Sequence, residues 1–166
     1  VVGAGPAGSS TAERCALHGL SVLLLEKRQE IGAPVRCGEG LSMKNIKELG
    51  LDPLPRRTWA QEIDGAFVYA PNGRQVEVRN ETSTGYVLER KYFDKWLAEQ
   101  ASRKGAMVIT KASVYDLIMD KTQGADGTIN TVRGVKVDIE GDKKEIRSKV
   151  VVACDGVESM VLRYCG

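Results

Sequence analysis

A glycine-rich turn at the start of the chain limits the fold more than any other feature of the sequence. The first residues are VVGAGPAG, in which Gly3, Gly5 and Gly8 follow the G-x-G-x-x-G spacing. In such a turn the first glycine permits the tight bend, the second lets the backbone approach a pyrophosphate, and the third lets a helix pack closely on a strand. The free N–H groups and the dipole of the following helix favour an anion there. The spacing therefore predicts a site for nucleotide phosphates.

The segments around the turn have the order that a dinucleotide-binding unit requires. Residues 1–2 predict the end of a buried strand, residues 9–18 a short helix, and residues 21–25 an inner parallel strand. Glu26 follows that second strand, where a carboxylate can accept hydrogen bonds from a ribose and repels a 2′-phosphate. A glycine-rich turn without a ligand is the alternative, and the spacing alone leaves both NAD and FAD open.

The rest of the chain mixes helical, parallel and antiparallel patterns. One short helix is expected at residues 42–49, with Ser42 as its N-cap and Gly50 beyond its end. Further patterns predict a hairpin at residues 66–69 and 75–79, a helix at residues 90–104, strands at residues 107–110, 113–119, 132–139 and 150–153, and a polar turn at residues 122–128. One domain is expected over residues 1–166, with a discontinuous parallel core at about 1–50 and 86–166 and an antiparallel insert at about 62–85.

Composition excludes several classes of function. The formal net charge is +2, from 24 Lys and Arg against 22 Asp and Glu, and no basic tract is present, so nucleic acid is not an expected partner. The longest apolar runs are far too short to cross a bilayer. The 4 cysteines are scattered and accompanied by 1 histidine, a pattern that predicts free thiols and no metal site.

Four segments that together span nearly the whole chain resemble one family. They are GAGPAGS, LEKRQEIGAPVRCGEGLS, GYVLERKYFDKWLAEQA and VVVACDGVES. These segments are similar to the geranylgeranyl reductase family of FAD-dependent oxidoreductases, in particular to the archaeal digeranylgeranylglycerophospholipid reductases. The resemblance implies FAD as the cofactor. It also implies an α/β fold, a Rossmann-like FAD-binding domain of the p-hydroxybenzoate hydroxylase and glutathione reductase type with an inserted antiparallel β-layer.

The resemblance assigns cofactor-binding residues as well. Ala7 would touch the pyrophosphate through its backbone, and the carboxylate after the second strand would hold the adenosine ribose. Val114 would border the adenine through its main chain, Arg90 would contact FAD, and the turn at Asp155 and Gly156 would support the cofactor-binding region. The full set of cofactor-binding candidates is Gly3, Gly5, Ala7, Gly8, Glu26, Arg28, Cys37, Gly38, Gly40, Arg90, Val114, Asp155 and Gly156.

Some of these candidates also fit another role. Arg90 and Asp94 taken alone would suggest an i,i+4 ion pair on a helix surface, whereas within YVLER-x-x-FD they suggest contact with FAD. Asp155 and Gly156 suit equally a turn that ends a buried strand. Cys37 is the candidate catalytic residue, because a thiolate in a loop beside a flavin could act in proton or redox chemistry. It would serve equally as a small residue that lets the loop approach the cofactor.

The reaction implied by the resemblance is saturation of C=C bonds in the geranylgeranyl chains of archaeal membrane glycerophospholipid precursors, with hydride supplied by reduced FAD. The implied partners are the isoprenoid lipid and an electron donor, either reduced ferredoxin or NAD(P)H. The expected location is the cytoplasm, with peripheral contact at the inner membrane face. Family members continue well beyond the last matching segment, so a C-terminal substrate portion is expected outside this chain, which alone should not turn over. The alternatives are a flavin-dependent monooxygenase of the same fold and a non-catalytic FAD-binding fragment.

Overall fold

The computed structural model of the protein describes residues 1–35, 37–79, 84–124 and 127–165. The chain divides into two units, one comprising Val1–Ala33 with Asp94–Gly166 and the other Pro34–Phe93. Among the helices of the described ranges, none is long and apolar enough to cross a membrane.

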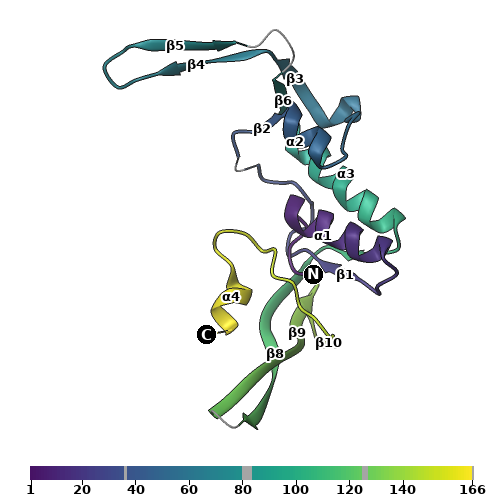
Figure 1. Ribbon diagram of the computed structural model, residues 1–166. Coiled ribbons are helices and arrows are strands. Elements are labelled where there is room, and N and C mark those ends of the chain that lie inside the picture. Colours follow the sequence, from purple (N-terminus) through teal and green to yellow (C-terminus); the bar gives the residue numbers. More distant parts are fainter. Residues whose placement is uncertain (36, 80–83, 125–126, 166) are drawn as a thin grey trace. The chain divides into compact units, whose positions relative to one another are not determined.

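A parallel sheet forms the centre of the first unit. Strand β1 (Leu23–Leu25) pairs in parallel with β7 (Met107–Ile109). On the other side of β1, Val2 forms a parallel bridge with Leu25 and a second parallel bridge with Ala153. The order across the sheet is therefore β7, β1, the segment at Val2 and the segment at Ala153, and Figure 1 shows the N-terminus beside β1.

The buried strand predicted at residues 150–153 is reduced to the bridge at Ala153. Val2 N–H donates to Val152 O at 2.9 Å, and Cys154 N–H donates to Val2 O at 2.8 Å. Among the described residues this segment is paired on one side, so its apolar run lies at the edge of the sheet. Val150 is accordingly 72% exposed. The prediction of a buried strand is correct in its parallel pairing at residues 152–154 and wrong in its burial at Val150.

Helix α1 (Pro6–Leu17) follows the glycine turn directly and begins before residue 9, where it was expected. Gly5 is its N-cap and Pro6 its first residue. Proline suits this position because its fixed φ is helical and its missing N–H would have no partner within the helix. Gly19, with a φ of 77°, lies just beyond the end of the helix, where glycine is common.

Small side chains fill the core around α1. Helix α3 (Arg90–Arg103) matches the helix predicted at residues 90–104, and Gly105 follows it with a φ of 104°. Alanines of α1 and of α3 meet in one buried cluster, which leaves room for close packing of these helices. The cluster consists of Ala4, Ala12, Ala16, Leu24, Ile31, Ala98, Ala101 and Ala106.

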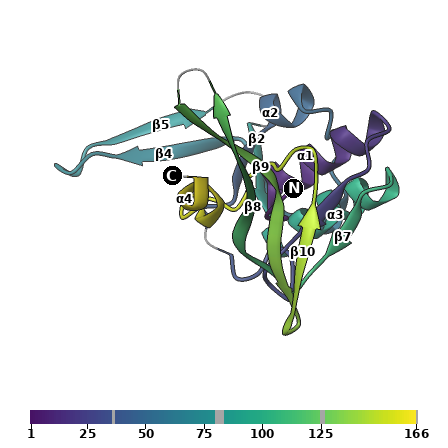
Figure 2. The same cartoon turned by 90° about the horizontal axis from the view of Figure 1, so that it is seen from below.

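An antiparallel sheet and helix α4 (Met160–Cys165) complete the first unit. The strands β8 (Ala112–Gly124), β9 (Gly127–Ile139) and β10 (Asp142–Arg147) lie side by side in the order β10, β9, β8 (Figure 2). Val161 of α4 packs in a buried apolar cluster with residues of β8 and β9, among them Leu117 and Val137.

The polar turn predicted at residues 122–128 is almost entirely strand. Thr122 pairs with Ile129 and Gly124 with Gly127, whereas residues 125–126 lie outside the described part of the chain. The chain reverses between Gly124 and Gly127, so the prediction is correct in the position of the turn and wrong in its length. The backbone ladder between β8 and β9 continues through this polar stretch. β10 has no apolar alternation either, since its sequence is DKKEIR.

The second unit is built from antiparallel strands. Strands β2 (Gly40–Ser42), β6 (Gly85–Leu88) and β3 (Trp59–Ile63) form one sheet in that order. Strands β4 (Gly65–Tyr69) and β5 (Gln75–Arg79) form a separate hairpin, which confirms the predicted one (Figure 1). The patterns gave no sign of β2, β3 or β6, so antiparallel pairing begins at residue 40 and not at about residue 62.

Two short helices lie in the same unit. Helix α2 (Met43–Glu48) confirms the helix predicted at residues 42–49. Ser42 is its N-cap as predicted, since Ser42 Oγ accepts a hydrogen bond from Asn45 N–H at 3.2 Å. The 3-10 helix η1 (Arg56–Thr58) leads into β3.

Candidate nucleotide-binding site

The glycine turn is tightly packed on two of its three glycines. Gly3 has a φ of 93°, and a Cβ placed on it would lie 2.4 Å from Cys154 O. A Cβ on Gly8 would lie 1.8 Å from Gly3 O. At Gly5, by contrast, nothing described lies within 4 Å of the Cβ position apart from the chain neighbours, so the turn is open there. The turn thus has the closely packed bend and the open outer side that the sequence predicted.

The first turn of α1 presents backbone N–H groups beside this opening. The first helical hydrogen bond runs from Ser9 N–H to Gly5 O at 2.9 Å. Pro6 has no N–H, so the amides of Ala7 and Gly8 are the donors that precede the first helical bond. These amides and the helix dipole favour a negatively charged group at this point. This position suits the backbone contact with a pyrophosphate that the resemblance implies for Ala7, and that contact stays a prediction.

Glu26 lies at the end of β1, beside the glycine turn. Its Oε2 accepts a hydrogen bond from Ala4 N–H at 2.9 Å, and its Oε1 accepts one from Arg28 N–H at 2.9 Å. Each carboxylate oxygen has two lone pairs, so acceptor capacity remains for the hydroxyls of a ribose. The sequence indicated the ribose role and gave no sign of the hydrogen bonds to the two turns. Arg28 itself donates from Nη1 to Ala33 O at 3.2 Å.

Ser9 is a polar residue of this site that the sequence reasoning missed. Its Oγ donates to Ala4 O at 3.1 Å, and both residues are 0% exposed. A signal for it exists in the sequence, because Ser9 shares the buried face of α1 with Ala12 and Ala16 at helical spacing. A serine on an alanine face needs a hydrogen-bond partner inside the protein.

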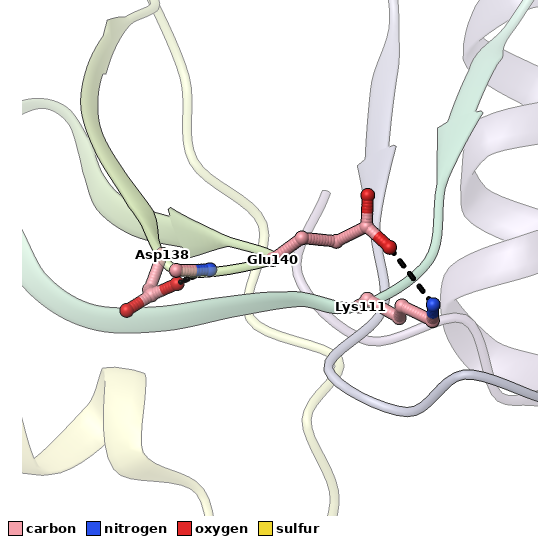
Figure 3. Close-up of polar contacts among 4 residues, drawn as sticks. Lys111, Asp138 and Glu140 are labelled. Atoms are coloured by element: carbon pink, nitrogen blue, oxygen red, sulfur yellow. Dashed lines mark hydrogen bonds and ion pairs between the residues drawn. The ribbon is translucent and has the colours of Figure 1, made fainter.

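The connection between β7 and β8 is tied to the turn after β1. Lys111 N–H donates to Arg28 O at 3.0 Å, and Ala112 N–H donates to Glu26 O at 2.8 Å. Figure 3 shows the side chains of Lys111 and Glu140 pointing toward each other, with Nζ and Oε1 2.8 Å apart. In the same view Asp138 Oδ1 accepts from Gly141 N–H at 2.7 Å.

The surface beside the carboxyl ends of β1 and β7 is hollowed. An open depression there is lined by Gln29, Glu30, Ile31, Lys95 and Thr110, and Lys95 Nζ pairs with Glu30 Oε1. In open α/β sheets ligands bind outside the carboxyl ends of the strands. Val114, the adenine candidate, is a half-buried residue of β8 next to a register shift.

Asp155 holds the start of α4 and lies directly behind the glycine turn. Its Oδ1 accepts from Ser159 Oγ at 2.6 Å, and its Oδ2 accepts from Met160 N–H at 2.8 Å and from Val161 N–H at 3.1 Å. Burial acts to raise the pKa of Asp155, but these hydrogen bonds outweigh it and hold the pKa below its usual value. A Cβ on Gly3 would lie 3.0 Å from Asp155 Cα, so the two turns are in contact. Gly156 follows with a φ of 90°.

Four sequence candidates belong to the second unit. Cys37 is exposed and its Sγ accepts a hydrogen bond from Glu39 N–H at 3.4 Å. Gly38 follows Cys37, Gly40 begins β2, and Arg90 begins α3. The assignment of these residues to a cofactor remains a prediction.

The residues of the first unit fit a dinucleotide. The closely packed bend, the open outer side at Gly5, the amides at the start of α1 and the acceptor capacity of Glu26 together suit a pyrophosphate and a neighbouring ribose. In the described part of the chain no group of three or more His, Cys, Asp and Glu residues is arranged to hold a metal ion.

Comparison with known proteins extends this picture over the whole chain. The family described as FAD binding domain matches residues 1–166. The chain is 43% identical to digeranylgeranylglycerophospholipid reductase 2 of Methanococcoides burtonii and 41% identical to digeranylgeranylglycerophospholipid reductase 1 of Methanothermobacter thermautotrophicus. Both comparisons cover 100% of this chain and only 39% and 40% of the relatives, so the chain spans about two fifths of their length.

Solved structures agree with the fold. The crystal structure of a geranylgeranyl bacteriochlorophyll reductase-like protein from Thermoplasma acidophilum matches 99% of this chain and 40% of its own, with a TM-score of 0.88 and 40% identity. A myxobacterial FAD-dependent chondrochloren halogenase matches 98% of this chain and 38% of its own, with a TM-score of 0.80 and 23% identity. At that identity the likeness to the halogenase concerns the fold alone.

These similarities confirm two expectations. The fold is that of the FAD-binding oxidoreductases, with a parallel core and antiparallel strands. FAD, and not NAD, is the dinucleotide. The similarity to digeranylgeranylglycerophospholipid reductases, inferred from four segments, extends over the full 166 residues. The chain belongs to the FAD binding domain family.

Proposed function

We propose that this chain is the FAD-binding part of a reductase that saturates C=C bonds in the geranylgeranyl chains of archaeal-type membrane glycerophospholipid precursors. The observation that carries the proposal is the similarity of the entire chain, at 43% and 41% identity, to two relatives named digeranylgeranylglycerophospholipid reductase. The open glycine turn and Glu26 supply the nucleotide site that such a reductase needs.

The described residues bind and orient the cofactor. The amides of Ala7 and Gly8 would hold the pyrophosphate at the start of α1, and the remaining acceptor capacity of Glu26 would hold the adenosine ribose. When bound, FAD supplies the hydride chemistry, while the protein positions it and excludes water. Val114 would border the adenine, and Asp155 with Gly156 would brace the glycine turn from behind.

Candidates in the second unit would contact the rest of the cofactor. Gly38 and Gly40 are small enough to let their loop pass close to it, and Arg90 would contact it from the start of α3. Cys37 is the candidate for the proton that completes saturation of the double bond, because its thiol is exposed in the loop that leads into β2.

The partners follow from the chemistry of the substrate. Reduction of a C=C bond consumes two electrons and two protons, so a donor must reduce the flavin again, and reduced ferredoxin or NAD(P)H would serve. The substrate is an isoprenoid lipid, so the full protein would work from the cytoplasm in peripheral contact with the inner membrane face. The substrate portion would come from the length of the relatives that this chain does not match.

A flavin reoxidation experiment tests the proposal. The full-length protein is purified with its flavin, reduced without oxygen, and mixed with a geranylgeranylated glycerophospholipid. Reoxidation of the flavin, with saturated chains found in the extract by mass spectrometry, is expected. A flavin that stays reduced until air is admitted, with rapid NADPH-driven oxygen consumption, would instead indicate a monooxygenase. A protein that takes up FAD but neither reacts with lipid nor consumes oxygen would indicate a non-catalytic FAD-binding role.

A further inference from the structure

The two peptide groups around Ala4 are held by side chains and not by the sheet. Ala4 N–H donates to Glu26 Oε2 at 2.9 Å, and Ala4 O accepts from Ser9 Oγ at 3.1 Å. Ala4 and Ser9 are both 0% exposed. Backbone groups that are buried need hydrogen-bond partners. The shape of the turn between Gly3 and Gly5 therefore depends on two side chains from other elements.

The hydrogen bond of Ser9 differs from the usual one of a helical hydroxyl. Such a hydroxyl ordinarily bonds to the carbonyl four residues earlier in its own helix. Thr11 does so, because its Oγ1 donates to Ala7 O at 2.8 Å. Ser9 reaches past that position to Ala4, which lies before the first residue of α1. Its hydroxyl thus links the helix to the glycine turn.

This bond sets the direction of the next N–H group. In a trans peptide the C=O and the following N–H point in opposite directions, and the only cis bond of the described chain is Asp52–Pro53. Because Ala4 O points inward to Ser9, Gly5 N–H points away from the buried face of α1. Gly5 is also the glycine of the turn whose Cβ position meets nothing within 4 Å among the described residues other than its chain neighbours.

We propose that Ser9 is a positioning residue of the pyrophosphate site. Together with Glu26 it fixes the peptides around Ala4, so that Gly5 N–H faces the phosphates before the nucleotide binds. Ser9 acts through the backbone, since its own side chain is buried under the turn. The inference rests on FAD binding by this chain and is independent of lipid reduction.

Nucleotide fragments separate this role from a general effect on folding. The full-length protein is stripped of FAD, and the affinities for ADP and for adenosine are measured by calorimetry. Ser9→Ala is expected to weaken ADP binding about three- to tenfold, the range for one hydrogen bond, and to leave adenosine binding unchanged. Ser10→Ala is the matched control, because Ser10 is the exposed neighbour on the same helix. Glu26→Gln is expected to weaken both ligands, because Glu26 also faces the ribose.

Either of two results would overturn the proposal. One is equal ADP affinity for Ser9→Ala and Ser10→Ala. The other is an equal loss for ADP and adenosine, which would mean that Ser9 only supports the fold. If Ser9→Ala does not fold, Ser9→Cys keeps the side-chain volume with a weaker donor. Its affinity for ADP should then be lower than that of the Ser10→Ala protein while its affinity for adenosine stays the same, and equal ADP affinities would reject the role.

Discussion

Lys111 and Glu140 both have a left-handed backbone without being glycine, with φ values of 53° and 55°, and their side chains form an ion pair of 2.8 Å. Lys111 connects β7 to β8, and Glu140 lies at the turn between β9 and β10. Glu140 N–H also donates to Lys111 O at 3.2 Å. The hydrogen bond from the Lys111 ammonium holds the pKa of Glu140 below its usual value. The pair thus joins two strained connections at one edge of the first unit.

Replacing Lys111 should separate backbone strain from the ion pair. Lys111→Gly removes about 1 kcal/mol of left-handed backbone strain and loses an exposed ion pair of small value. The urea midpoint of the full-length protein should therefore hardly change. Lys111→Val loses the same pair and keeps the strain with a β-branched residue, so its midpoint should fall clearly. Equal midpoints for the two variants would contradict this account.

Alanine substitutions at Gly8 and at Gly5 should have opposite effects, because the Cβ position is blocked at Gly8 and open at Gly5. Gly8→Ala would place a Cβ 1.8 Å from Gly3 O, so the protein should lose about 3 kcal/mol of stability or fail to fold. Gly5→Ala meets no described atom and should fold almost normally, yet its methyl group would face the pyrophosphate. Thermal unfolding and FAD titration measure the two effects. Tight FAD binding by Gly5→Ala would show that the phosphates lie elsewhere.

Asp155 should make part of the stability depend on acid pH. Its folded-state pKa is lowered, so the unfolded chain binds more protons in acid. The contribution is therefore complete above the unfolded pKa of about 3.9 and is lost as pH falls through the folded pKa. Asp155→Asn should lower stability near neutral pH by about 1 kcal/mol and flatten the loss below pH about 4. If the urea midpoints of the parent protein and Asp155→Asn changed in parallel with pH, the Asp155 carboxylate would not be the source of this acid dependence.

Cys37 should affect turnover more than cofactor binding. If its thiol supplies the proton, Cys37→Ala should keep the flavin spectrum and lose about 10²-fold in lipid saturation. Ser42→Ala, which removes the N-cap of α2 in the same unit, is a control for disturbance of the local fold. Turnover at the parent rate in Cys37→Ala would leave Cys37 with the role of a small residue in the loop.

Local signals explain which elements the sequence revealed. The glycine turn, Gly19 and Gly105 end or begin helices through their own backbone freedom, so α1 and α3 were located to within a few residues. Ser42 likewise marks α2. β10 and the ends of β8 and β9 have no such signal, because they form by pairing with each other along charged and polar sequence.

The same distinction applies to the site. Gly3, Gly8 and Glu26 follow from spacing alone, because the turn and the next strand are adjacent in sequence. The hydrogen bond from Ser9 to Ala4 depends on the direction in which α1 continues from the turn. The hydrogen bond from Ala4 to Glu26 depends on the pairing of Val2 with Leu25. Asp155 was indicated as a support, but its bonds to α4 required the helix to be seen.

The position of Val2 has a consequence for the order in which the protein folds. Val2 bridges Leu25, close by in sequence, and Ala153, near the other end of the chain. During synthesis the glycine turn and α1 leave the ribosome before residues 152–154. Until those residues follow, the segment at Val2 is paired with Leu25 on one side and has no partner on the other. Closing the loop from Val2 to Ala153 costs roughly 1.5 kcal/mol more in chain entropy than closing the loop from Val2 to Leu25. The nucleotide site is therefore expected to mature late, as one of the last parts of the first unit to become protected.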